Sequence, residues 1–457
     1  MDEQAVVERE AGLRRRLTRG QTIMISLGGA IGTALFLSSG IALGYAGPAA
    51  LVSYAIAGFI ALAMVFSLSE MAVVHPTAGS FGTYAELYIN PWAGFVVRYT
   101  YWFAQVIATG FEAVAAGLYM TWWFPQAPVW LWSLGFATVV VVVNSRSVAN
   151  FGRVEYWLSL IKVTAIVLFV ILGAAHIFGL GVKAVGLTNL YALPGGFFPH
   201  GAHGVWMAVI LGLLSFVGIE VIAVTSGEAP DPEKTIPAAL RTTALRLFLF
   251  YVLALTVVAA MFPWTEVAGS VAVTQSPFVK VLALTGIPQA AGVMNFVVIS
   301  AALSSMNTNV YLCSRMLFSL SRGRFAPAFL GRLSGAGAPV AAVLFSGGCI
   351  LAATALAKLT PKAYAYLQGV ALFGAITVWA IILVSHLRFR RVHPASTLKV
   401  RTPLFPVIQL AGLALLLALV VTMGMDPDWN ISCIVGIPWL CLLSLGYFIG
   451  KRVAAKA

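Results

Sequence analysis

The stretch TIMISLGGAIGTALFLSSG, residues 22–40, is apolar enough to cross a membrane, yet three glycines lie near its middle. They are Gly28, Gly29 and Gly32. A glycine lowers helix stability by about 1 kcal/mol relative to alanine, so one interpretation is that the helix unwinds locally inside the bilayer. Close packing against a neighbouring helix through small residues is the other interpretation. A second interrupted segment, described below, favours unwinding.

The composition places most of the chain in lipid. Of its 457 residues, 60% are hydrophobic and only 9% are charged, whereas a soluble domain carries roughly 25% charge. So few charges cannot cover a water-facing surface without exposing large apolar patches. The net charge of +13 does not indicate nucleic-acid binding, because the basic residues lie in short runs between long apolar segments.

The cysteines and histidines show no catalytic or metal-binding pattern. The spacing of the four cysteines fits neither a disulfide framework nor a metal site. The six histidines lie at or near the predicted span ends, without metal-ligand spacing. No phosphate-binding loop or charged pore ring is evident. We therefore expect no metal, no cofactor and no enzyme activity, and neither a channel nor ATP drive within this chain.

Twelve segments have the length and apolar character of membrane spans, each of which takes about 20 residues. They are 21–45, 48–74, 95–122, 129–148, 155–178, 203–226, 242–263, 287–313, 338–357, 363–387, 403–424 and 431–450. The expected fold is therefore an all-α integral membrane bundle of about twelve helices. The connection 314–337 is expected to contain an amphipathic helix on the membrane surface.

The basic residues predict the orientation. Of the 28 lysines and arginines, 23 fall on the side of the N-terminus, four fall on the opposite side, and Lys162 lies inside the fifth span. Cytoplasmic segments are rich in lysine and arginine, so both tails, residues 1–20 and 451–457, are expected in the cytoplasm. The first apolar run is followed by many more, which predicts a first span rather than a cleaved signal peptide.

A second interruption lies in the sixth span, LGLLSFVGIEVIAVTSGE, where Gly218 and Glu220 stand inside an apolar run. The first and sixth spans correspond if 21–178 and 203–387 are two five-span halves, with 403–450 as two accessory helices. Halves with five spans each have opposite orientations in the membrane. Matched interruptions in such halves indicate the central site of a transporter. The freed backbone groups suit a zwitterion, whose carboxylate meets N–H groups and whose ammonium meets carbonyls.

The order of several motifs resembles a known family. They are SLGGAIGTALFLSSG, SEMAVVHPTAGSFGTYAELYINPWAGF, FGRVEYWLSLIKV, SFVGIE, GEAPDPEKTIPAALR and ALSSMNTNVYLCSRMLFSLSRGRFAP. Over nearly the whole chain the sequence resembles the amino acid transporter family of the amino acid–polyamine–organocation superfamily. The resemblance implies a leucine-transporter-like fold, an inverted repeat of five plus five helices with helices 1 and 6 broken. It also implies proton-coupled uptake of amino acids across the bacterial inner membrane.

The resemblance also implies where the substrate binds. N–H groups near Thr33 and Ala34 would meet its carboxylate, and carbonyls of Ala30 and the sixth span would meet its ammonium. The implied substrate residues are Ala30, Ile31, Gly32, Thr33, Ala34, Leu214, Ser215, Phe216, Val217 and Gly218. The chain departs from the family at Ala34, where relatives usually carry glycine, and at Leu214, where many carry an aromatic gate that Phe216 would replace here. Because of both departures, the substrate of this protein cannot be inferred from that of a relative.

Three ionisable residues inside spans need a reason, because a charge at mid-bilayer costs on the order of 2.5–3.5 kcal/mol. Lys162 either snorkels to the cytoplasmic interface or, by the resemblance, gains and loses the coupled proton. Glu112 either bonds a neighbouring helix or faces the substrate cavity. Glu220 either supports the broken sixth span or couples protonation to gate movement.

The sequence thus predicts a permease that imports amino acids, with H+ as the coupling ion and alternating access to the two sides. The alternative is an exchanger of amino acids or amines on the same fold. The expected partners are a small-molecule substrate and membrane lipid, with no nucleic acid. The sequence leaves open which amino acid is carried, whether symport or exchange operates, and the oligomeric state.

Overall fold

The computed structural model describes residues 6, 9, 18–28, 31–77, 79–146, 148–180, 183–224, 232–267, 276–284, 289–335 and 337–454, and their regular elements are all helices. The α-helices are α2 (Arg19–Gly28), α3 (Thr33–Ala46), α4 (Ala50–Val74), α5 (Ser80–Tyr88), α6 (Pro91–Met120), α7 (Val129–Arg146), α8 (Val148–Phe178), α9 (Gly201–Phe216), α10 (Val221–Val224), α11 (Pro232–Met261), α12 (Trp264–Val267), α13 (Pro277–Leu284), α14 (Ala290–Arg322), α15 (Val340–Thr354), α16 (Leu356–Leu359), α17 (Ala363–Val392), α18 (Val407–Met425) and α19 (Ile431–Ala454). Short 3-10 helices are η1 (Gly47–Ala49), η2 (Thr188–Leu190), η5 (Ala328–Gly331) and η6 (Ala395–Thr397).

Nine helical segments of the described residues are long and apolar enough to cross a membrane. The first of them, Thr33–Val74, joins α3 and α4 through η1, and shorter apolar helices lie at Gly201–Phe216 and Phe248–Met261. The predicted all-α, multi-span membrane fold is confirmed. The count of twelve spans stays a prediction, because α2, α3 and α9 stop at breaks and are individually too short to span a bilayer of about 30 Å.

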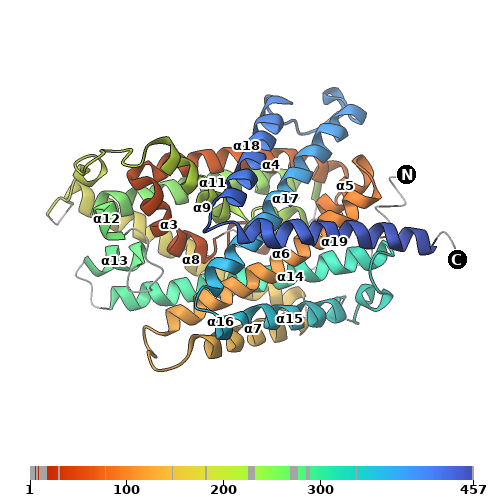
Figure 1. Cartoon of the computed structure of the whole chain (residues 1–457), viewed down its shortest axis with the longest axis horizontal. Coiled ribbons are helices and arrows are strands. Elements are labelled where there is room, and N and C mark those ends of the chain that lie inside the picture. The colour runs from red at the N-terminus through yellow and green to blue at the C-terminus, as the bar shows by residue number, and fades with distance from the viewer. Residues whose placement is uncertain are drawn as a thin grey trace.

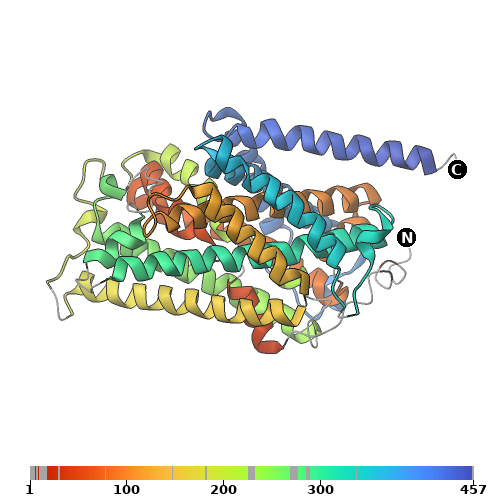
Figure 2. The same cartoon turned by 90° about the horizontal axis from the view of Figure 1, so that it is seen from below.

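Most of the long helices, among them α6, α14 and α19, run along one direction of the molecule, whereas α17 and α18 are inclined to it (Figures 1 and 2). Helices α12 and α13 lie at one end of this bundle, and α5 and the C-terminal end of α19 lie at the other (Figure 1). Helix α6 packs against α14 and α17 in the interior. Helices α18 and α19 lie at the periphery and expose apolar side chains such as Leu417 and Leu442, as a lipid-facing surface requires.

The two interrupted spans lie side by side. Helix α3, which follows the first break, packs along α9, which precedes the second. Helix α2 packs against α8, and α8 packs against α14. The first break therefore lies beside α8, and the helix that follows the second break, α10, contacts α14. Polar side chains from α6, α8 and α14 are described below.

One sequence expectation about a connection is wrong. Residues 314–322 do not start a separate amphipathic helix on the membrane surface but continue α14 to Arg322. Leu317, Phe318 and Leu320 are buried, so the apolar side of this stretch packs inside the protein and not against lipid. Among the described residues of this connection, the short η5 is the regular element between α14 and α15.

Two ion clusters tie helices together near α5. Glu70 of α4 accepts hydrogen bonds from His386 Nε2 at 2.6 Å and Arg390 Nη1 at 2.9 Å, both on α17. Glu86 of α5 forms salt bridges with Arg98 at 2.9 Å and with Arg9 at 2.5 Å. Burial raises the pKa of Glu86, but the hydrogen bond from Arg9 and the charges of Arg98 and Arg9 outweigh it, so its pKa lies below the ordinary value.

Candidate functional site

The first span is interrupted at its glycines. Helix α2 ends at Gly28 and α3 begins at Thr33, and Gly32 between them is extended, with φ −101° and ψ −167°. Gly29 and Ala30 lie outside the described residues. Close packing also occurs, because a Cβ at Gly28 would lie 1.6 Å from Ser159 Oγ. Both features expected from the sequence therefore occur at these glycines: the helix is interrupted, and a neighbouring helix packs closely against it.

The sixth span is interrupted after Phe216, where α9 ends. Val217 is extended, and Gly218 has a φ of +103°, a conformation that side chains other than glycine rarely adopt. Glu220 Oε2 accepts a hydrogen bond from the Gly218 N–H at 3.1 Å, and its Oε1 accepts one from the Tyr101 hydroxyl at 3.1 Å. The carboxylate thus supports the break, and its link to Tyr101 joins the break to α6.

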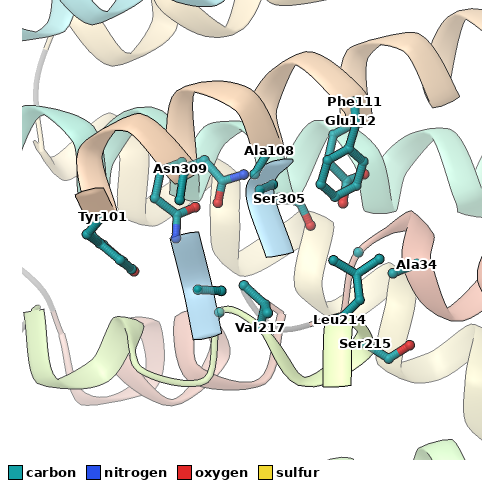
Figure 3. Close-up of a pocket in the computed structure, with 16 residues that line it drawn as sticks. Ala34, Tyr101, Ala108, Phe111, Glu112, Leu214, Ser215, Val217, Ser305 and Asn309 are labelled. Atoms are coloured by element: carbon teal, nitrogen blue, oxygen red, sulfur yellow. The ribbon is translucent and has the colours of Figure 1, made fainter. Parts of the chain in front are cut away.

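A cavity lies between the two breaks (Figure 3). Its walls come from both broken spans and from α6, α14 and α17. The lining residues are Gly32, Ala34, Tyr101, Ala104, Gln105, Ala108, Phe111, Glu112, Leu214, Ser215, Val217, Gly218, Ser305, Asn309, Ala371 and Ala375. Ser305 Oγ is buried and has no hydrogen-bond partner among the described residues, so it is available to a ligand in this cavity.

The structure brings most of the sequence-derived substrate residues to this cavity. Ile31 and Thr33 flank the lining residue Gly32 in the chain. Phe216 differs, because its ring packs against Tyr251 at 5.1 Å between centroids and is not part of the lining. Successive residues of a helix point about 100° apart. Phe216 lies two residues after Leu214, so the two side chains point to nearly opposite sides of the helix. The aromatic side chains of the lining are instead Phe111 and Tyr101.

Helix α6 forms a wall of the cavity of which Glu112 alone was predicted from the sequence. Tyr101, Gln105 and Ala108 line the cavity together with Glu112. They stand four, three and four residues apart, a spacing that puts them on one face of a helix. This face could have been predicted from the sequence by counting back from Glu112 at helical spacing. Asn309 of α14 and the alanines of α17 carry no comparable signal.

Glu112 lies at the N-terminus of α3. Both of its carboxylate oxygens are within hydrogen-bonding distance of the Thr33 N–H, at 3.2 and 3.3 Å. A Cβ at Gly32 would lie 2.3 Å from Glu112 Oε1, so only glycine lets the carboxylate come this close. The N-terminus of a helix favours negative charge. Glu112 therefore bonds a neighbouring helix and lines the cavity at the same time.

Lys162 lies at the other side of the first break. Its ammonium donates to the carbonyls of Gly28 and Ile31, the latter at 2.9 Å, and to Ser304 Oγ at 2.8 Å. The side chain is fully buried near the middle of α8, which does not fit a lysine that snorkels to the interface. Carbonyls at the C-terminus of a helix attract positive charge, so the ammonium stabilises the end of α2.

The match to known proteins covers nearly the whole chain. The family model for amino acid permeases matches residues 21–456. The chain belongs to the amino acid permease family. The uncharacterized amino acid permease YtnA of Bacillus subtilis (strain 168) is 39% identical over 97% of this chain and 96% of its own length. The amino-acid permease RocC is 38% identical and the gamma-aminobutyric acid permease 36% identical, both from the same organism and each covering at least 96% of both chains.

Family membership gives the cavity its general role. The protein is a membrane-embedded, multi-pass transporter rather than an enzyme, and amino acids are the class of small molecule that this permease family carries. The described residues place no group of three or more histidine, cysteine, aspartate or glutamate side chains where a metal ion would bind.

Proposed function

We propose that this permease imports zwitterionic amino acids by proton symport, across the bacterial inner membrane and with both termini in the cytoplasm. The observation that carries the proposal is the fully buried ammonium of Lys162, held between the end of α2 and Ser304 of α14. In this position the ammonium links the break in the first span to α14 through hydrogen bonds. Those bonds change when the ammonium loses a proton, so protonation can control the position of the break.

The substrate carboxylate binds at the N-terminus of α3 and takes the place of Glu112. The Thr33 N–H now donates to Glu112, and two carboxylates cannot share one N–H at that helix end without strong repulsion. Substrate binding therefore moves Glu112 off Thr33, and this exchange of one carboxylate for another is the binding step.

The substrate ammonium binds near the end of α9. Its last carbonyls lie at a helix C-terminus, which favours positive charge, and Ser215 and Val217 line the cavity there. The hydroxyl of Ser305 offers an acceptor from the opposite wall. Small residues of α6 and α17, among them Ala108 and Ala371, leave room for a side chain.

Proton coupling acts through the number of hydrogen bonds that Lys162 can donate. A charged lysine has three N–H donors, and all three have acceptors here. Loss of a proton removes one donor and the positive charge that stabilises the carbonyl end of α2. The break then loosens, and the cavity changes the side to which it opens as one bundle moves against the other.

The direct test is uptake of a panel of radiolabelled amino acids into proteoliposomes, with and without an inward proton gradient. Gradient-driven accumulation of one class supports symport and names the substrate. In Lys162→Met we expect gradient-driven uptake to be lost while exchange against a preloaded amino acid continues. Unchanged gradient-driven uptake in this variant would sink the role of Lys162.

An exchanger on the same fold is the second candidate function. The enclosure of Lys162, with every donor engaged, also suits a permanent cation that never titrates. Uptake seen only against a preloaded amino acid or amine, and insensitive to a proton gradient, would favour the exchanger and remove proton coupling.

A further inference from the structure

A second buried charge lies close to Lys162 and has no place in the function described so far. Glu155 is fully buried in α8, seven residues before Lys162. Its Oε1 accepts hydrogen bonds from the hydroxyls of Ser159, at 3.0 Å, and Ser304, and its Oε2 accepts one from Asn307 Nδ2 at 3.1 Å. All three partners are donors, the arrangement that an ionised carboxylate requires.

Ser304 connects the two charges. Its hydroxyl accepts from Lys162 Nζ at 2.8 Å and donates to Glu155 Oε1. Among the described residues the lysine and the glutamate make no direct salt bridge, so the hydroxyl is the link between them. A hydroxyl that accepts on one side and donates on the other can pass a proton by taking one and releasing another.

We propose that Glu155 is the proton acceptor paired with Lys162, and that the coupled proton passes between them through the hydroxyl of Ser304. The Lys162 ammonium gives a proton to Ser304 Oγ while the original Ser304 proton moves to Glu155 Oε1. An ammonium and a carboxylate become an amine and a carboxylic acid, with one proton moved and no electron transferred. The inference rests on the proton symport proposed above.

The surroundings of the pair are the helices that pack along α8. Four helices pack along α8, namely α2, α7, α11 and α14. Helix α14 presents Ser304 and Asn307 to Glu155, and α7 adds Asn144, whose amide donates to Asn307 Oδ1 at 2.8 Å. Among the described residues, Lys162 is the charged side chain that interacts electrostatically with Glu155. Lys162 also interacts electrostatically with Glu112, which lies across the break. Arg246 of α11 is exposed.

Helix α2 covers the carboxylate. A Cβ at Gly28 would lie 2.4 Å from Ser159 Cβ and 3.1 Å from Glu155 Oε1, and one at Gly20 would lie 4.0 Å from Tyr156. Gly20, at the start of α2, is exposed. Movement of α2 away from α8 therefore breaks the Gly28 bond to Lys162 and opens Glu155 to water in one step, so the proton leaves only when the first span moves.

The test compares two serines that donate to the same oxygen. Ser304→Ala removes the link to Lys162, Ser304→Thr keeps a hydroxyl there, and Ser159→Ala removes a donor that Lys162 does not contact. Glu155→Gln removes the acceptor itself. Each variant in proteoliposomes is assayed for substrate-driven proton influx with an internal pH dye, and for counterflow of the transported amino acid at equal pH.

We expect proton influx to fall about 100-fold in Ser304→Ala and Glu155→Gln, the contribution of a positioned proton-transfer group. Ser304→Thr and Ser159→Ala should retain it. Counterflow at equal pH requires no net proton transfer, so in all four variants it should fall by no more than about tenfold, the effect of losing one hydrogen bond to a charged group, worth about 1.5 kcal/mol. If Glu155→Gln does not fold, the three serine variants decide the question alone.

The outcomes separate the relay from the function on which it rests. A wild-type protein that shows substrate-driven proton influx, with the same influx in Ser304→Ala, overturns the relay and leaves symport intact. Equal losses in Ser304→Ala and Ser159→Ala also overturn it, because a structural role for the carboxylate predicts that pattern. A wild-type protein without proton influx overturns symport and the relay together.

Discussion

The break between α2 and α3 is held by side chains from other helices, whereas the break after α9 is held first by its own Glu220. Lys162 of α8 binds the carbonyls on one side of the first break, and Glu112 of α6 binds the N–H on the other. Glu220 binds the Gly218 N–H two residues before it. Both solutions satisfy backbone groups that lipid cannot, but only the first depends on two opposite charges from neighbouring helices.

The difference teaches where coupling can act. Charges from neighbouring helices hold a break at one position, so a change in those charges changes the free energy of moving the break. A hydrogen bond within the broken segment moves together with the segment and has no such effect. We therefore expect perturbations at the first break to alter ion coupling and those at the second to alter mainly the stability of the local structure.

The largest effect should come from Lys162→Met. Removing the ammonium leaves the Gly28 and Ile31 carbonyls without a donor and the buried Glu155 without its nearby cation. Removing one partner of a buried charged pair costs about 3 kcal/mol. That corresponds to a loss of gradient-driven uptake on the order of 100-fold. The matched change at the second break, Glu220→Gln, keeps an oxygen acceptor for Gly218 and should leave the response to a proton gradient in place. Equal loss of that response in both variants would contradict the comparison.

A smaller effect of opposite sign is expected from Glu112→Gln. A neutral amide competes for the Thr33 N–H less strongly than a carboxylate, and the difference of about 1.4 kcal/mol predicts an apparent KM about tenfold lower. The decarboxylated amine of the same substrate has no group that competes for Thr33, and its inhibition constant serves as the control. A higher KM for the amino acid would mean that Glu112 attracts the substrate instead of making way for it.

At the second break, Tyr101→Phe should have a modest effect. It removes one hydrogen bond to Glu220, worth about 1 kcal/mol, and the Gly218 bond persists. Thermal unfolding in detergent should shift downward slightly, and the ratio of protons to substrate carried should not change. A changed ratio would show that the second break also takes part in coupling.

The smallest effect concerns Glu86, which belongs to neither break and therefore shows what an ordinary ion cluster contributes. Its pKa is lowered from an ordinary value of 4.5 by Arg9 and Arg98, against the effect of burial. A carboxyl whose pKa falls on folding stabilises the fold above its unfolded pKa, and that stability is lost as the pH falls through the lower, folded pKa. The unfolding temperature of the wild type should therefore drop below about pH 4.5 more than that of Glu86→Gln. Parallel curves for the two proteins would exclude this contribution.

Much of the fold could be predicted from the sequence because lipid imposes simple requirements on length and polarity. The interruption at Gly28 and Gly32 and the one at Gly218 were visible as glycines within apolar runs. The continuation of α14 beyond residue 313 was not predictable in the same way, since a buried apolar face and a membrane-facing one have the same periodicity.

The polar site was predictable in part. Lys162 stood out as a charge inside an apolar run, but Glu155 did not, although it lies in the same motif, FGRVEYWLSLIKV. Residues seven apart lie on one face of a helix after two turns, and this spacing would have paired them. Which oxygen links them could not be predicted, because Ser304 approaches from α14, and its distance from α8 depends on how the two helices pack.

The salt bridge between Arg9 and Glu86 joins positions 77 residues apart, and this separation sets an order of events during synthesis. Arg9 is made before any membrane span, while its partner follows the whole of α4. At about 5–20 residues per second, the arginine waits for several seconds, and the bridge closes only after α4 and α5 have been made. The salt bridge can therefore form only after the chain from Arg9 to Glu86 has been synthesised. An affinity tag placed directly before Arg9 would therefore lie beside a salt bridge that links the start of the chain to α5.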